Sequence, residues 1–111
     1  MADLNALGLA YRKWALERPA LYAIIFGGRL ERPVEPGQQA GDRAFAPLLH
    51  RVTRAIDAGA LTPGDPQQIS LSIWAAVHGA VSLESQGLTD ESIFAVVQEC
   101  VQRGWATEAR R

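Results

Sequence analysis

The 111-residue sequence has few of the residues on which most metal and nucleophilic sites depend. It contains one cysteine, Cys100, and two histidines, His50 and His78, which are widely separated along the chain. A single cysteine excludes a disulfide within the chain and fits a reducing, cytoplasmic compartment. These residues form no cluster at the spacing of zinc ligands, and no Ser-His-Asp or Cys-His arrangement is legible. We therefore expect no metal, no cofactor and no enzymatic activity.

The chain also lacks a block of charge of either sign. Eleven Lys and Arg residues offset twelve Asp and Glu residues, for a net charge of −1. Because no basic run could neutralise a row of phosphates, this chain alone should not bind DNA. The segment 66–83 carries no charge, but Gln67, Ser70 and His78 interrupt it, and its apolar part is too short to span a bilayer. We expect no membrane contact and a helix that protein covers on most sides.

Apolar residues recur at helical spacing in five segments, and no alternating strand pattern accompanies them. The sequence predicts one all-α domain, residues 1–111, that folds as a five-helix bundle. A Pro- and Gly-rich loop is expected at 29–41. The first helix should be capped by Asp3 and end before Pro19, where a second, short helix starts. The last three helices are expected at about 42–58, 66–86 and 90–105.

The ends of the last helices carry specific capping chemistry. Asp65 followed by Pro66 is typical of a helix start, with the carboxylate as cap and the proline at the first helical position. Gly59 and Gly87 are placed to end the third and fourth helices. Thr89 is the expected cap of the fifth. These signals separate the last three helices clearly.

The fourth helix has apolar residues on two roughly opposite sides. Two apolar stripes need two packing partners. The other helices of the domain could cover both stripes, or a second copy of the chain could cover one of them. In the second case the last two helices of each copy would form a four-helix interface. On the fifth helix we expect Cys100 to be a buried, inert thiol. The expected interface residues are Ala75, Ala76, Gly79, Leu83, Val97, Val101 and Trp105.

An ordered set of short motifs resembles a known family. Trp74, His78 and Gly79 stand in the order Trp-x-x-x-His-Gly, after Tyr11…Trp14…Glu17-Arg18-Pro19, Leu21-Tyr22 through Phe26-Gly27, and Asp57-Ala58-Gly59-Ala60-Leu61. Together they look like the C-terminal regulatory domain of tetracycline-repressor-like (TetR-family) transcription factors, in the subtype with a Trp-His-Gly signature. The resemblance covers roughly residues 4–105.

The resemblance implies a homodimer made by the last two helices and an effector held between the helices. It also implies a DNA-binding helix-turn-helix head, to which nothing in this chain corresponds, so DNA would be bound only through that missing N-terminal domain. The chain is then either a piece of a longer protein, which we favour, or a headless relative. Effector binding would change the spacing of two DNA-reading heads.

A small, largely apolar effector needs aromatic walls with a few polar tips. The expected ligand-binding residues are Trp14, Tyr22, Phe26, Leu49, Val52, Trp74 and His78. Each could instead be an ordinary core residue, and His78 could bond a neighbouring helix rather than a ligand. The leading hypothesis is a regulatory domain of a bacterial TetR-family repressor. The alternatives are a headless dimerisation module without a ligand and, more remotely, a small helical enzyme.

Overall fold

The computed structural model describes residues 2–18 and 35–107, with side chains in 4–18 and 45–107. Four α-helices make up this part of the chain: α1 (Ala2–Glu17), α3 (Glu35–Asp57), α4 (Pro66–Ser85) and α5 (Glu91–Trp105). The described residues contain no strand beyond one isolated bridge, which confirms the all-α prediction. The predicted second helix, with Tyr22 and Phe26, lies outside the described residues, so the five-helix count stays a prediction.

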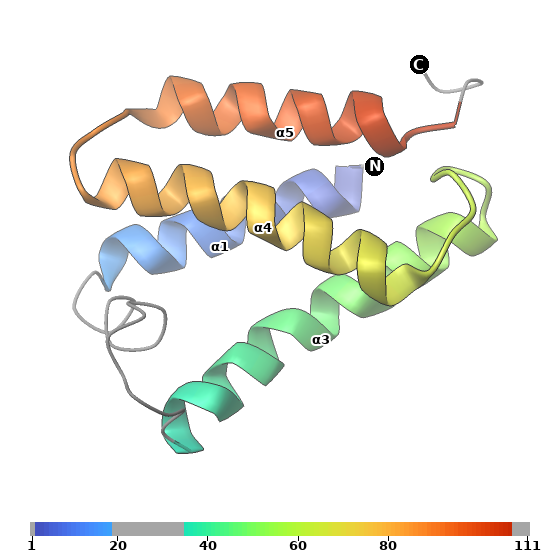
Figure 1. Cartoon of the computed structure of the whole chain (residues 1–111), viewed down its shortest axis with the longest axis horizontal. Helices are drawn as coiled ribbons and strands as arrows, with labels where there is room; N and C mark the ends of the chain where they lie inside the picture. Colours follow the sequence, from blue (N-terminus) through green and yellow to red (C-terminus); the bar gives the residue numbers. More distant parts are fainter. Residues whose placement is uncertain (1, 19–34, 108–111) are drawn as a thin grey trace.

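α4 is the centre of the arrangement and packs against each of the three other described helices. Figure 1 shows α5 running alongside α4, while α1 passes behind it and α3 crosses at a steeper angle. Ten buried residues form the shared core, and half of them come from α4. They are Ala15, Leu48, Val52, Leu61, Ile69, Ile73, Val77, Ala80, Val81 and Phe94.

The predicted ends of α3 and α4 are confirmed in atomic detail. The carboxylate of Asp65 accepts a hydrogen bond of 2.9 Å from the backbone N–H of Gln67, and Pro66 opens α4. Gly59 and Gly87 follow α3 and α4 with φ of 78° and 76°, left-handed values that a side chain would disfavour. Local capping chemistry therefore fixes both ends of the α3–α4 connection.

Three predicted helix starts are wrong. α1 begins at Ala2, before its expected cap Asp3, and α3 begins at Glu35, seven residues before Asp42. The prediction of a loop up to residue 41 relied on the Pro- and Gly-rich composition. It failed because Pro36 lies in the first turn of α3, where a proline is tolerated. α5 is capped by Asp90 rather than Thr89, since the Asp90 carboxylate accepts bonds from the backbone N–H and the hydroxyl of Ser92.

The buried side of α5 also differs from the prediction. Phe94 is 3% exposed and faces the core, with Val97, Val101 and Trp105 packed partly against it. Cys100 is exposed, so the prediction of a buried thiol is wrong for the single chain. The apolar residues of α5 are spread around more than one side of the helix, so their pattern does not decide which side is buried. The large Phe94 ring lies on the side that packs against the core.

A short backbone pairing ties the chain end to the α3–α4 connection. Leu61 and Ala106 form an isolated antiparallel bridge, and both are almost fully buried. Thr62 donates its backbone N–H to the carbonyl of Trp105 at 2.8 Å, and Thr107 donates to Ala60 at 3.2 Å. These bonds hold the end of α5 against the α3–α4 connection.

Candidate functional site: an apolar cavity between three helices

A cavity of about 460 Å³ lies between α1, α3 and α4. Its size falls within the range of pockets that bind small molecules. Aliphatic and aromatic side chains dominate the lining, and no acidic or basic side chain belongs to it among the described residues. The lining residues are Leu4, Leu7, Gly8, Ala10, Tyr11, Trp14, Pro47, Leu48, Ile73, Trp74 and Val77.

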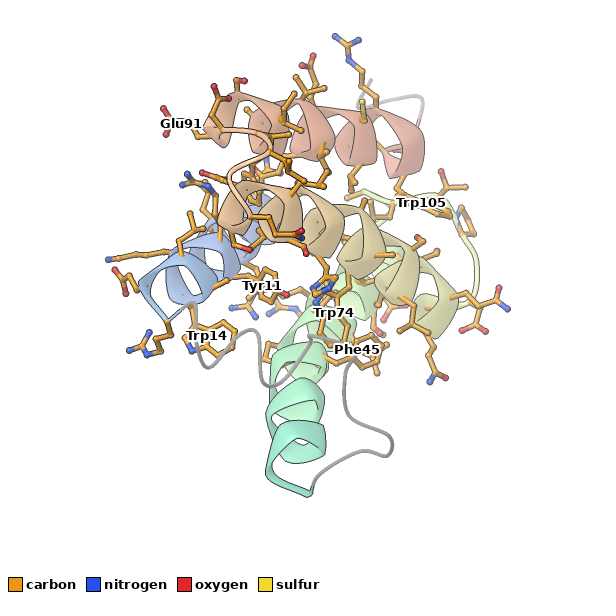
Figure 2. The ribbon with its side chains drawn as sticks, turned by 60° about the vertical axis from the view of Figure 1, so that its left-hand side comes forward. Tyr11, Trp14, Phe45, Trp74, Glu91 and Trp105 are labelled. Carbon is orange, nitrogen blue, oxygen red and sulfur yellow. The ribbon has the colours of Figure 1, made fainter. Side chains whose placement is uncertain are left out.

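Two aromatic pairs lie at the cavity, and three of their four rings, those of Tyr11, Trp14 and Trp74, belong to its lining. Tyr11 and Trp14, one turn apart on α1, have ring centroids 6.2 Å apart. Trp74 of α4 stacks on Phe45 of α3, with centroids 5.7 Å apart and ring planes 24° from parallel. Figure 2 shows the first pair on the α1 side and the second on the α3–α4 side. The stacking fixes the orientation of both rings and presents broad, flat, apolar surfaces.

A hydrogen bond between Tyr11 and His78 provides a polar point in the cavity wall. The Tyr11 hydroxyl lies 3.0 Å from Nδ1 of His78. This hydrogen bond, in which either group can be the donor, links α1 to α4. Burial lowers the pKa of His78 below its ordinary value, because an imidazolium is poorly solvated there. A neutral imidazole and a neutral phenol therefore face the cavity region around pH 7.

The sequence-predicted ligand residues are only partly brought together. Trp14 and Trp74 line the cavity, and His78 lies next to it as the partner of Tyr11. Leu49 is half-buried and Val52 is fully buried in the core, but neither belongs to the lining. Their role as ligand contacts stays a prediction that the cavity geometry does not support. Tyr22 and Phe26 lie outside the described residues.

Most of the α1 wall was missed by sequence reasoning. Its small residues, Gly8 and Ala10, carry no signal of their own, and Leu48 differs from the predicted Leu49 by one position. Tyr11 could have been found, because it lies three residues before Trp14 and so on the same helix face. The Tyr11–His78 contact joins residues 67 positions apart, which no local pattern encodes.

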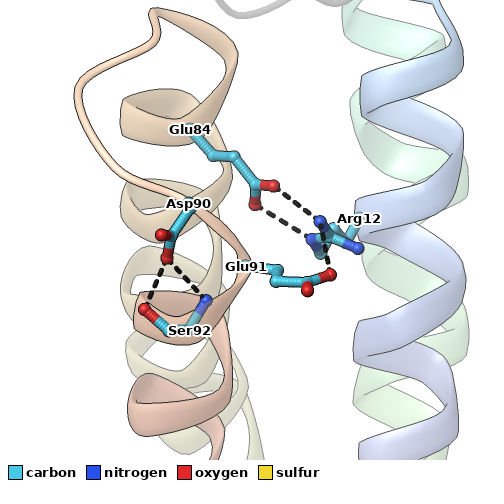
Figure 3. A network of polar contacts seen from close by, with 5 residues as sticks. All are labelled: Arg12, Glu84, Asp90, Glu91 and Ser92. Carbon is cyan, nitrogen blue, oxygen red and sulfur yellow. Dashed lines mark hydrogen bonds and ion pairs between the residues drawn. The ribbon is translucent and has the colours of Figure 1, made fainter.

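On another side of α1, Arg12 joins the helix to the corner between α4 and α5. Its guanidinium donates to both carboxylate oxygens of Glu84, at 2.9 and 2.6 Å, as Figure 3 shows. The two side chains are only 22% and 13% exposed, so solvent screens the pair less than an open surface pair. Glu91 lies 3.9 Å from the same guanidinium, which also stands 5.7 Å above the Phe94 ring. We call Arg12 and Glu84 the clasp.

Several uncharged residues of the α4–α5 region are exposed or partly exposed, and we call this set the outer face. It combines small residues of α4 with large apolar residues that are 39–67% exposed. A Cβ added at Gly79 would meet no other atom within 4 Å. Of the residues predicted for pairing, Ala75, Gly79 and Leu83 belong to this set, while Val97, Val101 and Trp105 pack on the chain's own core. The outer face comprises Leu71, Ala75, Gly79, Leu83, Leu88, Ile93, Val96 and Cys100.

Two kinds of site are absent from the described residues. No three His, Cys, Asp or Glu side chains within 2–18 and 35–107 come together as a group that could hold a metal ion. None of the helices in the same ranges is long and apolar enough to cross a membrane. The cavity, the clasp and the outer face are therefore the features from which a function can be argued.

Comparison with known proteins identifies the family. The family described as "Tetracyclin repressor-like, C-terminal domain" matches residues 4–107, nearly the whole chain. No curated protein matches. A solved structure from Rhodococcus sp. RHA1, a protein with unknown function, is similar over 94% of this chain, with a TM-score of 0.80 and 28% identity. This chain spans 57% of that structure's length. The chain belongs to the tetracycline-repressor-like C-terminal domain family.

Proposed function

We propose that this chain is the regulatory domain of a TetR-family transcriptional repressor, which binds a small apolar effector and forms a homodimer. The observation that carries the proposal is the cavity of about 460 Å³ between α1, α3 and α4, with tryptophans on two of its walls. The cavity is partly open, since its lining residue Ala10 is exposed, so a small molecule could enter from solvent. A hollow lined by aromatic rings is the usual form of a site for a small molecule.

Homodimerisation through the outer face is the second part of the proposal. Five large apolar side chains of the α4–α5 region are exposed there, and small residues of α4 would let a second backbone approach closely. Large apolar side chains left in open solvent are costly, and a protein interface would bury them. Because a two-fold axis places the same surface on both copies, the α4–α5 pairs of two chains would form a four-helix interface.

α1 is the element through which the two sites would communicate. Tyr11 and Trp14 face the cavity, whereas Arg12 reaches the α4–α5 corner through Glu84. An effector that fits better when α1 is displaced from α4 would therefore bias the position of the clasp beside the dimer-forming pair. The population shift can be no larger than the difference in effector affinity between the two arrangements. DNA would be bound by a head outside this chain, and this domain would be regulatory rather than enzymatic.

Effector binding is tested by tryptophan emission during titration with a panel of neutral apolar compounds. Trp14 and Trp74 line the cavity, so a bound compound should change their emission, while the Trp105→Phe variant removes the remote tryptophan. Ala10 is exposed and lines the cavity, so Ala10→Phe should narrow the site and weaken binding with the fold intact. The exposed Ala58, which directly follows α3, provides a control, Ala58→Phe. A flat response to the whole panel would leave a dimerisation module without a ligand.

Dimerisation is tested by sedimentation of the Gly79→Glu variant. Nothing lies within 4 Å of a Cβ at Gly79, so the added side chain should not disturb the single chain. In the proposed interface it would bring two carboxylates between closely packed helices and weaken the dimer at least tenfold. Ala6→Glu adds the same charge to an exposed site on α1 and should leave the dimer unchanged. A Gly79→Glu profile equal to wild type would remove this residue from the interface, and a monomeric wild type would remove the dimer.

A further inference from the structure

We propose that the effector is an uncharged molecule, and that the cavity between α1, α3 and α4 rejects the carboxylate counterpart of the same ligand. This inference rests on the proposed function, because it assigns a ligand class to the same cavity.

The lining offers no ionic partner among the described residues. The eleven lining residues in the described part of the chain are aliphatic, aromatic or glycine, and their only polar side-chain atoms are the Tyr11 hydroxyl and the two indole N–H groups. A carboxylate moved from water into such surroundings loses its hydration without gaining an opposite charge. A hydroxyl or carbonyl loses far less, and one hydrogen bond is enough to compensate it.

The polar point beside the cavity is also neutral. The Tyr11 hydroxyl is bonded to Nδ1 of His78, and burial disfavours protonation of that imidazole. A phenol and a neutral imidazole form hydrogen bonds with neutral polar groups and need no charged partner. The pair cannot supply the full positive charge that a buried carboxylate needs.

Two basic groups near the cavity are engaged elsewhere. Arg51 donates from Nη1 to the carbonyl of Pro47 at 3.4 Å, so its guanidinium lies by the α3 wall, but its side chain is not part of the lining. Arg12 points to Glu84 on another side of α1. Of these two, Arg51 is the group by which an anion could be held at the edge of the cavity, and the test therefore includes it.

The test uses two pairs of probes, 2-naphthol with 2-naphthoate and 1-decanol with decanoate, titrated into the whole chain at pH 7.5 by calorimetry. We expect the alcohol of a bound pair to bind at least tenfold more tightly than its acid. The Ala10→Lys variant should reverse this order, because it places an ammonium on an exposed position of the lining. Ala58→Lys is the control. Ala58 is exposed and directly follows α3, ten residues after Leu48 in the chain, so this variant should keep the wild-type order.

The possible failures are distinct. Acids that bind as tightly as alcohols would overturn the uncharged class while leaving a ligand site. If that binding were lost in Arg51→Gln, Arg51 would be assigned as an anion partner. No heat with any of the four probes, together with unchanged tryptophan emission, would overturn the ligand site itself and this inference with it.

Discussion

Two neighbouring turns of α4 are equally apolar, but only one of them borders the cavity. Ile73, Trp74 and Val77 line it, whereas one turn later Ala80 and Val81 lie outside its lining. Exposure differs little between the turns, at 6% and 7% for Ile73 and Val77 against 4% and 0% for Ala80 and Val81. All except the half-buried Trp74 belong to the same core cluster. Composition alone therefore does not distinguish a filled interior from a hollow one. The difference comes from what the other helices bring opposite each turn.

The largest expected effect comes from adding one methylene to each of these turns. Val81→Ile should destabilise the fold by about 1–3 kcal/mol, because a filled core has no room for added volume. Val77→Ile should be neutral or should stabilise by up to about 0.8 kcal/mol, since its added methylene can enter the cavity. Urea unfolding followed by circular dichroism measures both variants.

The two valines serve as controls for each other, because both are buried, lie on one helix and receive the same substitution. Similar losses of stability at the two positions would show that the space beside Val77 is filled in solution. Val77→Ile should also weaken effector binding, whereas the effect of Val81→Ile should be confined to stability.

The same contrast explains what could be predicted from the sequence. The α3 and α4 ends were predictable because Asp65, Gly59 and Gly87 act on backbone groups only a few residues away. Trp14 and Trp74 were identified from their aromatic character and spacing. The cavity as a whole was not, because a hollow depends on which side chains of three helices fail to meet. The turn of α5 that places Phe94 inside and Cys100 outside depends on packing in the same way.

A smaller effect is expected at the clasp, which joins the cavity helix to the filled α4–α5 corner. We predict a coupling energy of about 1 kcal/mol between Arg12→Met and Glu84→Gln in a double-mutant cycle. The bonds are charge-assisted and two in number, but both side chains retain some solvent contact. Thermal or urea unfolding of the four proteins gives the value.

The chain contains a suitable comparison for the clasp. Lys13 and Glu17 form an i,i+4 pair on α1 at 4.0 Å, with side chains 76% and 53% exposed. Their coupling should be near zero to a few tenths of a kcal/mol. Equal coupling in the two pairs would mean that Arg12 and Glu84 are screened like an open surface pair, and that the clasp is too weak to link α1 with the dimer-forming helices.

The smallest expected effect is a pH dependence that originates at the edge of the cavity. Burial lowers the pKa of His78 in the folded chain, so the unfolded chain binds a proton more readily. This contribution to stability is complete above the unfolded histidine pKa of about 6.5 and is lost as pH falls from there toward the folded value. His78→Gln should flatten the decline of stability between pH 7 and pH 5, as measured by urea unfolding across that range. Asp90, whose pKa is lowered by its hydrogen bonds from Ser92, affects stability only below about pH 3.8, outside this range.

An unchanged slope in His78→Gln would mean that the imidazole is as well hydrated in the folded chain as in the unfolded one. The side of α4 next to the cavity would then be no less hydrated than the unfolded chain.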